Sequence, residues 1–151
     1  MKDRFLSRAL RLDNGEPVEG YYFGAPAGYF IREVGDGMFY TDEVHAVNAA
    51  TIDQCTGIRD GSGTLIFEND ILRHEKHGIC SHYSVVWNDD RWLLERYVPF
   101  GGEDGCGGPG HPGFKFPPAC ERRHVKVVGN LRETKNQRHG RRQTNFGATT
   151  E

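Results

Sequence analysis

Hydrophobic positions along the chain recur in short alternating runs, and the three- and four-residue spacing of an amphipathic helix is rare. The clearest run is residues 83–87, where apolar side chains stand at every second position. The turn-forming residues 88–90 follow, and a second alternating run begins near Trp92. The pattern predicts a β-hairpin in which Trp87 and Trp92 lie in contact across the turn.

Turn signals divide the rest of the N-terminal half into similar pieces. Asn14 and Gly15 predict a tight turn between two strands within residues 5–23, because both residues tolerate positive φ. Residues 24–28 read as a loop, and residues 29–42 as a second hairpin with its tip at 34–37. Residues 41–53 fit a helical turn or a short connector equally well.

The segment QCTGIRDGSGTLIFENDILRH, residues 54–74, contains two sharp bends around one short strand. It predicts strands at 54–59, 64–67 and 71–73, with Asn69 in left-handed geometry at the second bend. Such closely spaced bends are typical of a small curled sheet. We therefore expect a mainly β fold, a small curled sheet or partly open β-barrel built from consecutive hairpins. The residues assigned to its turns and core are Asn14, Gly15, Gly57, Asp60, Gly63, Asn69, Asp70, Trp87, Trp92 and Gly129.

The C-terminal third contains one further predicted strand. Residues 99–120 form a Gly- and Pro-rich insertion that excludes a regular helix or a central strand. A last strand follows at 125–128 and is closed by Gly129 and Asn130. Residues 133–151 are polar and aperiodic, which predicts a mobile tail behind a single domain spanning residues 1–132.

The formal net charge of the 151 residues is −2, so no global field draws the protein to nucleic acid. The charge is unevenly placed, because residues 122–142 contain eight Lys or Arg and one acid. This basic end is either a solvated tail or a phosphate-binding surface. The candidate nucleic-acid-binding residues are Arg122, Arg123, Lys126, Arg138, Arg141 and Arg142, with Arg132 and Lys135 in the same run.

Four side chains in and after the insertion could hold zinc: Cys106, His111, Cys120 and His124. Their spacing lacks the paired C-x2-C knuckle of the well-defined zinc motifs, so an unliganded loop is the alternative. We expect no other cofactor.

Catalytic chemistry has little support in the sequence. Asp60, Glu68 and Asp70 could bind a cation or act as an acid/base pair, but each lies at or beside a predicted turn and is expected to be structural. Three histidines flank Cys80, and this stretch reads as a polar connector with a buried thiol. Since no phosphate-binding loop, nucleophile elbow or metalloprotease motif is present, we expect a protein that is not an enzyme.

No apolar run approaches the roughly 18–20 residues that span a bilayer, and the first residues lack the apolar core of a secretory signal. These features predict a cytoplasmic protein that makes no membrane contact. Cysteines stay reduced in that compartment, so free thiols are expected.

The order of these motifs resembles that of the YopX protein family. The resemblance begins at RFLSRALRLDNGEPVEGYYF, is strongest at TIDQCTGIRDGSGTLIFENDIL, and continues through YSVVWNDDRWLL to VVGN, covering residues 4–130. The positions that match the family's central run are Gln54, Thr56, Gly57, Ile58, Asp60, Gly63, Ile66, Phe67, Glu68, Asp70 and Ile71.

Three departures from the family stand out. Asn69 occupies a position where the family usually has Gly, the 106–120 loop is an insertion, and a basic tail replaces a short acidic or apolar ending. The resemblance implies a mainly β fold, a phage or prophage setting and a tendency to self-associate. It implies no reaction.

Our first hypothesis is therefore a non-enzymatic, phage- or prophage-derived module that contacts itself or another phage or host protein. The alternative is a small nucleic-acid-binding module that uses the basic C-terminal segment.

Overall fold

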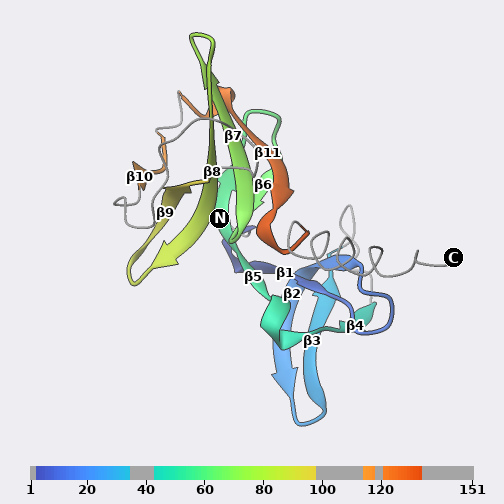
Figure 1. The fold of residues 1–151 in the computed structure, drawn as a ribbon. Helices are drawn as coiled ribbons and strands as arrows, with labels where there is room; N and C mark the ends of the chain where they lie inside the picture. Colours follow the sequence, from blue (N-terminus) through green and yellow to red (C-terminus); the bar gives the residue numbers. More distant parts are fainter. Residues whose placement is uncertain (1–2, 35–42, 98–113, 118–120, 134–151) are drawn as a thin grey trace, which may run out of the picture.

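The computed structural model describes residues 3–34, 43–97, 114–117 and 121–133, which fold into two antiparallel β-sheets (Figure 1). The predicted mainly β, hairpin-built fold is confirmed. The two sheets do not close into a barrel, which is consistent with the small curled sheet of the prediction.

The first sheet, called here the N-terminal sheet, has six strands in the order β4-β3-β2-β1-β5-β6. The strands are β1 (Leu6–Leu10), β2 (Pro17–Ala25), β3 (Gly28–Glu33), β4 (Val44–Ala46), β5 (Asp53–Arg59) and β6 (Leu65–Phe67). A 3-10 turn, η1 (Asp3–Phe5), precedes it.

The predicted turn between β1 and β2 is present. Gly15 has a φ of 73°, and the Asn14 side-chain oxygen accepts the Glu16 backbone N–H at 2.9 Å. The next turn is tighter than expected, because β2 and β3 continue into the predicted loop until only Pro26 and Ala27 remain between them.

Strand β4 occupies part of the segment for which a helical turn or a connector was considered. It pairs with β3 through Phe30–Ala46 and Arg32–Val44, and a 3-10 turn, η2 (Ala49–Thr51), follows. The segment 41–53 therefore contains one helical turn, η2, as well as the short strand β4 that was not expected. The predicted hairpin tip extends into residues 35–42, which lie outside the described residues.

The second sheet, called here the C-terminal sheet, has five strands in the order β10-β9-β8-β7-β11. They are β7 (Asp70–Lys76), β8 (Ile79–Asn88), β9 (Arg91–Arg96), β10 (Phe114–Lys115) and β11 (Val125–Asn130), with η3 (Arg122–His124) before the last.

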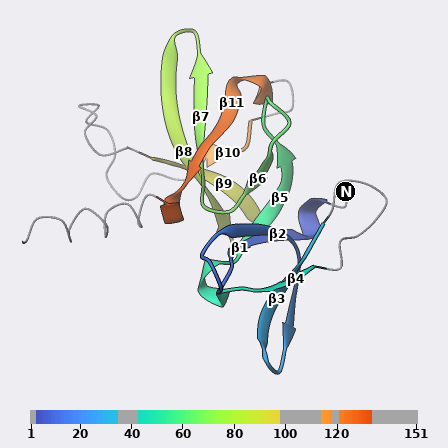
Figure 2. The same ribbon diagram turned by 90° about the vertical axis from the view of Figure 1, so that its right-hand side faces the viewer.

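Two hairpins build most of this sheet. In the β8–β9 hairpin Asp89 has a φ of 48°, and the rings of Trp87 and Trp92 meet edge to face at 4.9 Å, as predicted. The β7–β8 hairpin turns at His77 and Gly78, both at positive φ, where a polar connector was expected. It projects from one end of the molecule, while the β2–β3 hairpin projects from the other (Figure 2).

Left-handed residues produce the predicted bends between β5 and β7. Gly57 has a φ of 74° where the β5–β6 register shifts, and Gly63 has a φ of 87° in the turn before β6. Asn69 has a φ of 63° before β7, as expected. These bends carry the chain from the N-terminal sheet into the C-terminal sheet.

The core of the described residues consists of two apolar clusters. One consists of Ala9, Val18, Ile31 and Val47; the other consists of Ile66, Leu72, Val85, Leu94 and Val125. Ile66 is on β6, so the edge strand of the first sheet contributes to the core of the second.

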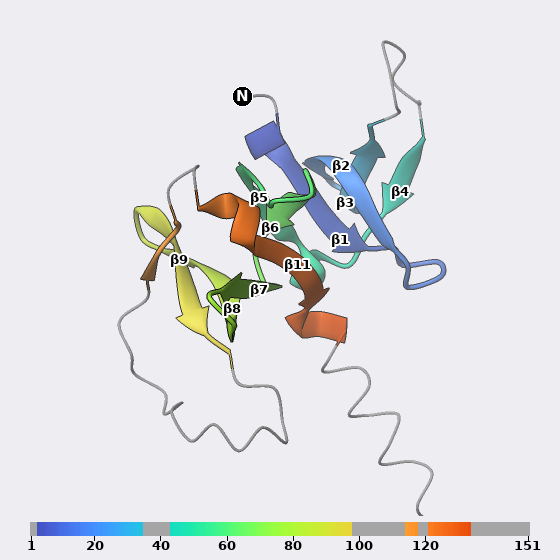
Figure 3. The ribbon, with the colours of Figure 1, turned by 90° about the horizontal axis from the view of Figure 1, so that it is seen from above.

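Strand β11 also runs beside this junction, next to β5 and β6 (Figure 3). The Gly61 N–H donates to the Val125 carbonyl at 2.9 Å, and a Cβ on Gly61 would approach the Arg123 backbone to 2.7 Å. Gly61 therefore permits the close approach of the turn and the strand. Among the described residues, no helix is long and apolar enough to span a bilayer.

Candidate functional site

The most buried polar groups lie at the junction of the two sheets. Asp53 begins β5 and is 2% exposed, whereas Asp70 begins β7 and is fully buried. Buried carboxylates are costly unless cations and hydrogen-bond donors surround them. Their partners therefore decide whether they are structural or chemical.

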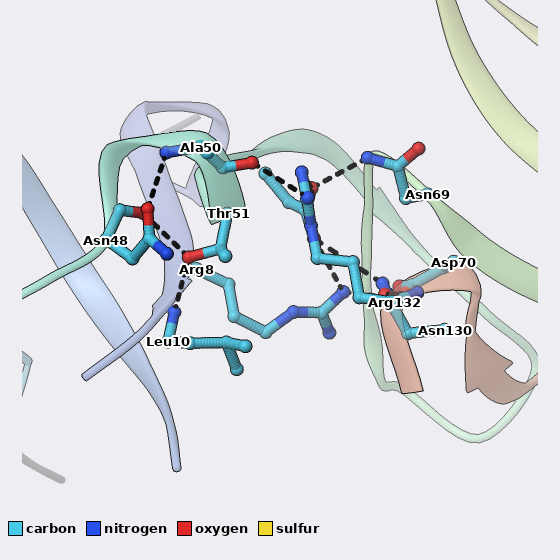
Figure 4. A network of polar contacts seen from close by, with 10 residues as sticks. Arg8, Leu10, Asn48, Ala50, Thr51, Asn69, Asp70, Asn130 and Arg132 are labelled. Carbon is cyan, nitrogen blue, oxygen red and sulfur yellow. Dashed lines mark hydrogen bonds and ion pairs between the residues drawn. The ribbon is translucent and has the colours of Figure 1, made fainter. Parts of the chain in front are cut away.

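Two arginines from distant parts of the chain neutralise this pair (Figure 4). Arg8, on β1, donates to Asp70 Oδ1 at 2.5 Å and lies 3.9 Å from Asp53 Oδ2. Arg132 follows β11 and donates from Nη2 and Nε to Asp53 Oδ1 at 2.8 and 3.1 Å. Two anions thus meet two cations.

Amide groups complete the network. The Asn69 amide donates to Asp53 at 2.7 Å, and the Asn130 amide donates to Asp70 at 3.2 Å. The Phe67 backbone N–H donates to the second Asp70 oxygen at 2.8 Å. Since each carboxylate is held by an arginine and by further donors, we assign both to structure.

The same network anchors η2. Arg132 Nη1 donates to the Ala50 carbonyl at 2.9 Å. Asn48 caps the turn by accepting the Ala50 N–H, and Thr51 accepts the Leu10 N–H through its hydroxyl (Figure 4). Strand β1, η2 and the end of β11 are therefore fixed to one another by polar contacts.

The acids singled out from the sequence do not converge on one point. Asp60 is 7% exposed and accepts the N–H groups of Ser62 and Thr64 on one oxygen and that of Val127 on the other, at 2.8–2.9 Å. Burial acts to raise the pKa of Asp60, but these backbone donors outweigh it and hold the pKa below its usual value. Asp60 thus fastens its own turn to β11.

The Glu68 carboxyl group lies in different surroundings from that of Asp60. Burial, the largest cause, raises the pKa of Glu68, and its backbone N–H donates to Gln54. Asp60, Glu68 and Asp70 form no cluster of three metal-ligating side chains within the part of the chain that the structure describes.

A polar groove of about 620 Å³ opens beside the charge network. Arg8, Asp53 and Arg132 line it together with Glu19 and Glu33. Burial raises the pKa of Glu19, while Arg8, its cross-strand neighbour, acts to lower it. The sequence pattern did not indicate this groove.

The predicted zinc ligands are only partly covered by the structure. Cys106, His111 and Cys120 lie outside the described residues. The ring of His124 lies 6.4 Å from that of His74, edge to face, and its Nε2 accepts a hydrogen bond from Arg123 at 3.0 Å. Zinc binding by the four residues stays a prediction.

The structure around Cys80 differs from the prediction of a polar connector with a buried thiol. Cys80 is exposed on β8 and accepts a hydrogen bond from Arg73 Nε at 3.2 Å, so the predicted buried thiol is wrong. The buried cysteine is Cys55, whose thiol pKa is raised by burial. Both are free thiols, and the remaining cysteines lie outside the described residues.

Three of the predicted nucleic-acid-binding residues, Arg122, Arg123 and Lys126, lie on η3 and β11. Arg123 and Lys126 line a shallow groove of about 410 Å³ with Arg73 and Lys76 of β7. Lys126 pairs directly with Arg73 across the strands. We call Arg73, Lys76, Arg123 and Lys126 the basic groove.

Other members of the predicted basic surface are placed differently. Arg138, Arg141 and Arg142 lie outside the described residues. Arg132 belongs to the internal charge network, so its assignment to a phosphate-binding surface is corrected. Arg122 donates to the Pro117 carbonyl at 3.4 Å.

A second surface is the β2–β3 hairpin, which the sequence predicted only in part. Tyr22 and Tyr29 stack on one face with centroids 5.9 Å apart, and Phe23 and Phe30 stack on the other at 5.6 Å. Gly24 lies beneath the Tyr29 ring, and a Cβ built on Gly24 would be 3.7 Å from the nearest ring carbon. We call these four rings the aromatic hairpin.

The hairpin is exposed and carries no charge. Tyr22, Phe23 and Tyr29 are 39%, 38% and 47% exposed, and residues 20–31 contain no ionisable acid or base besides tyrosine. Paired exposed rings of this kind are typical of contact surfaces.

Comparison with protein-family models matches residues 32–136 to the YopX protein family. The chain belongs to the YopX protein family. The match includes the central bends, the β7–β9 hairpins and β11, and it confirms the family resemblance. The aromatic hairpin lies entirely before the matched range. No curated protein matches the chain.

Replacement of Arg132 by Met should destabilise the fold by roughly 2–4 kcal/mol, because Asp53 would remain buried without its main cation. Urea denaturation followed by tryptophan fluorescence measures the change. Arg59→Met is the matched control, since Arg59 pairs with Asp3 at the surface and should contribute at most about 1 kcal/mol. Equal effects of the two substitutions would contradict the assigned role of the network.

Replacement of Asp60 by Asn should cost about 1–3 kcal/mol at neutral pH, because the amide nitrogen cannot accept the backbone donors. The native pKa of Asp60 is lowered, so its contribution is complete above the unfolded value near 4 and disappears as pH falls through the native pKa. The stability difference between wild type and D60N should therefore shrink in acid.

Denaturation midpoints at several pH values between 7 and 3 test this expectation. Asp90→Asn is the control, because Asp90 is an exposed turn acid whose hydrogen bonds go to the neighbouring Arg91. A stability difference between wild type and D60N that stays constant down to pH 3 would show that the charge of the Asp60 carboxylate does not contribute to stability.

Proposed function

We propose that this YopX-family protein is a non-enzymatic module that self-assembles through its aromatic hairpin, in the phage or prophage setting of its family. The observation that carries the proposal is the pair of exposed ring stacks on a projecting, uncharged hairpin (Figure 1). Aromatic side chains bury large areas on association and lose little conformational entropy.

A second copy fits this surface better than a nucleic acid does. The twelve positions around the tip contain no Lys or Arg, so a phosphate backbone would find no counter-charge there. Two identical uncharged hairpins can approach without repulsion, and ring stacks on both faces allow each copy to contact a neighbour.

The internal use of the acids supports the non-enzymatic part of the proposal. Asp53, Asp60 and Asp70 are each held by structural partners, so none of them is placed to transfer a proton to a substrate. In this proposal the turns and acids maintain the fold, and the function lies on the surface.

The double substitution Phe23→Ser and Tyr29→Ser should convert assembled wild-type protein into single chains, because it removes one ring from each stack. Light scattering coupled to size exclusion, over a range of concentrations, measures the mass. Ile79→Ser is the matched control, since Ile79 is exposed at the tip of the other projecting hairpin. A wild-type mass equal to one chain at high concentration would contradict the proposal, as would an assembled double variant.

The basic groove supports a second candidate function, binding of single-stranded nucleic acid. It joins two residues predicted from the basic segment with Arg73 and Lys76, which come from a distant strand. Arg73 and Lys76 pair with Glu75 and Glu121, whereas Lys126 makes no ion pair with any residue in the described ranges.

The double substitution Arg123→Glu and Lys126→Glu should weaken binding of a fluorescent single-stranded oligonucleotide about tenfold or more at low salt. It should also reduce the salt dependence measured by anisotropy. Arg91→Glu, on the β8–β9 turn, is the charge-matched control. Equal affinity of wild type and double variant would contradict binding at the basic groove. Loss of binding only on deletion of residues 135–151 would assign nucleic-acid binding to the tail.

A further inference from the structure

The strands β3 and β4 bring together three potential metal ligands that no sequence motif indicated. Glu33 ends β3, His45 is the middle residue of β4, and Glu43 immediately precedes β4. One ligand atom from each side chain lies within 4.8 Å of the other two. The group is distinct from the charge network, the aromatic hairpin and the basic groove.

The backbone fixes this arrangement. The Glu33 N–H donates to the Glu43 carbonyl at 3.0 Å, and Ile31 pairs with His45. Alternation along the strands then places both carboxylates and the imidazole on one face. Ile31 is fully buried on that face and the His45 side chain is only 14% exposed, so the imidazole is held against the core.

The distances suit ligands of one ion. His45 Nε2 lies 3.1 Å from Glu33 Oε2 and 3.7 Å from Glu43 Oε2. Neighbouring ligands of an ion with bonds of about 2.1 Å are separated by about 3.0–3.5 Å in octahedral or tetrahedral geometry. A small movement of the exposed Glu43 side chain would bring all three atoms into that range.

The electrostatics also favour a cation. Two carboxylates directly opposite each other across a strand pair repel. The Arg11 guanidinium also acts on Glu33 electrostatically. A divalent ion would neutralise both carboxylates and use the imidazole as a ligand.

We propose that Glu33, Glu43 and His45 form a binding site for a divalent transition-metal ion, with Mn²⁺ and Zn²⁺ as the ions that suit two carboxylates and one imidazole. Three protein ligands leave open coordination positions for water or another ligand. Glu33 also lines the 620 Å³ groove, so the site can be reached from solvent at that side. The bound ion would fix the edge strand β4 to β3.

The test uses Mn²⁺ and the full chain, because Mn²⁺ prefers oxygen and nitrogen ligands and avoids the cysteines of the insertion. The electron paramagnetic resonance signal of free Mn²⁺ measures the bound fraction. We expect one Mn²⁺ per chain with a Kd below about 100 µM. Glu43→Gln and His45→Ala should each raise the Kd at least about tenfold.

Glu75→Gln is the matched control, because Glu75 is an exposed strand glutamate in the other sheet and pairs with Arg73. It should leave Mn²⁺ binding unchanged. Glu43 is 70% exposed, so E43Q keeps the fold and remains informative even if H45A does not fold. Absence of saturable Mn²⁺ binding up to about 1 mM, or unchanged binding in E43Q, would show that the three residues form only an ion-paired cluster.

Discussion

The junction of the two sheets depends on two buried carboxylates and on the two partly exposed arginines that pair with them. Apolar contact between the sheets is made at one edge, where Ile66 of β6 packs into the cluster of the C-terminal sheet. Arg8 and Asp53 come from the N-terminal sheet, whereas Asp70 belongs to the C-terminal sheet and Arg132 follows its last strand. Ion pairs have strict distance requirements, so this network restricts the relative position of the sheets further than the Ile66 contact does.

The network also explains why the central bends are so sharp. Asp70 must leave its bend with one oxygen toward the Phe67 N–H and the other toward Arg8. Asn69 supplies the left-handed residue of that bend and a donor to Asp53 at the same time. A glycine at this position would meet the backbone requirement alone. In this chain one residue therefore connects turn geometry with the ion-pair network.

Local signals predicted much of the fold, because turn chemistry acts over a few residues. Asn14 and Gly15, the bend at Asn69 and the tryptophan pair of the β8–β9 hairpin are all located as expected. The His77–Gly78 turn was missed although glycine follows a residue type that tolerates positive φ. A two-residue turn between the runs ILRHEK and ICSHYSV was the available signal.

The site was less predictable because its contacts are non-local. Arg132 and Asp53 are 79 residues apart, and Arg8 and Asp70 are 62 apart, so no spacing rule links them. Asp53 sat in a segment without clear periodicity, and Arg132 resembled its basic neighbours in sequence. Only the three-dimensional arrangement distinguishes an internal arginine from one that faces solvent.

The positions of the remaining surfaces constrain how the protein can act. The aromatic hairpin extends from the N-terminal sheet, and the basic groove lies on β7 and β11 of the C-terminal sheet. Figures 1 and 2 show the β2–β3 and β7–β8 hairpins at opposite ends. A copy bound at the aromatic hairpin would therefore leave the basic groove open. Assembly through the aromatic hairpin would then repeat the basic groove along the assembly. A nucleic acid that contacts several grooves at once would bind more tightly than one that contacts a single copy, whose groove carries few unpaired cations.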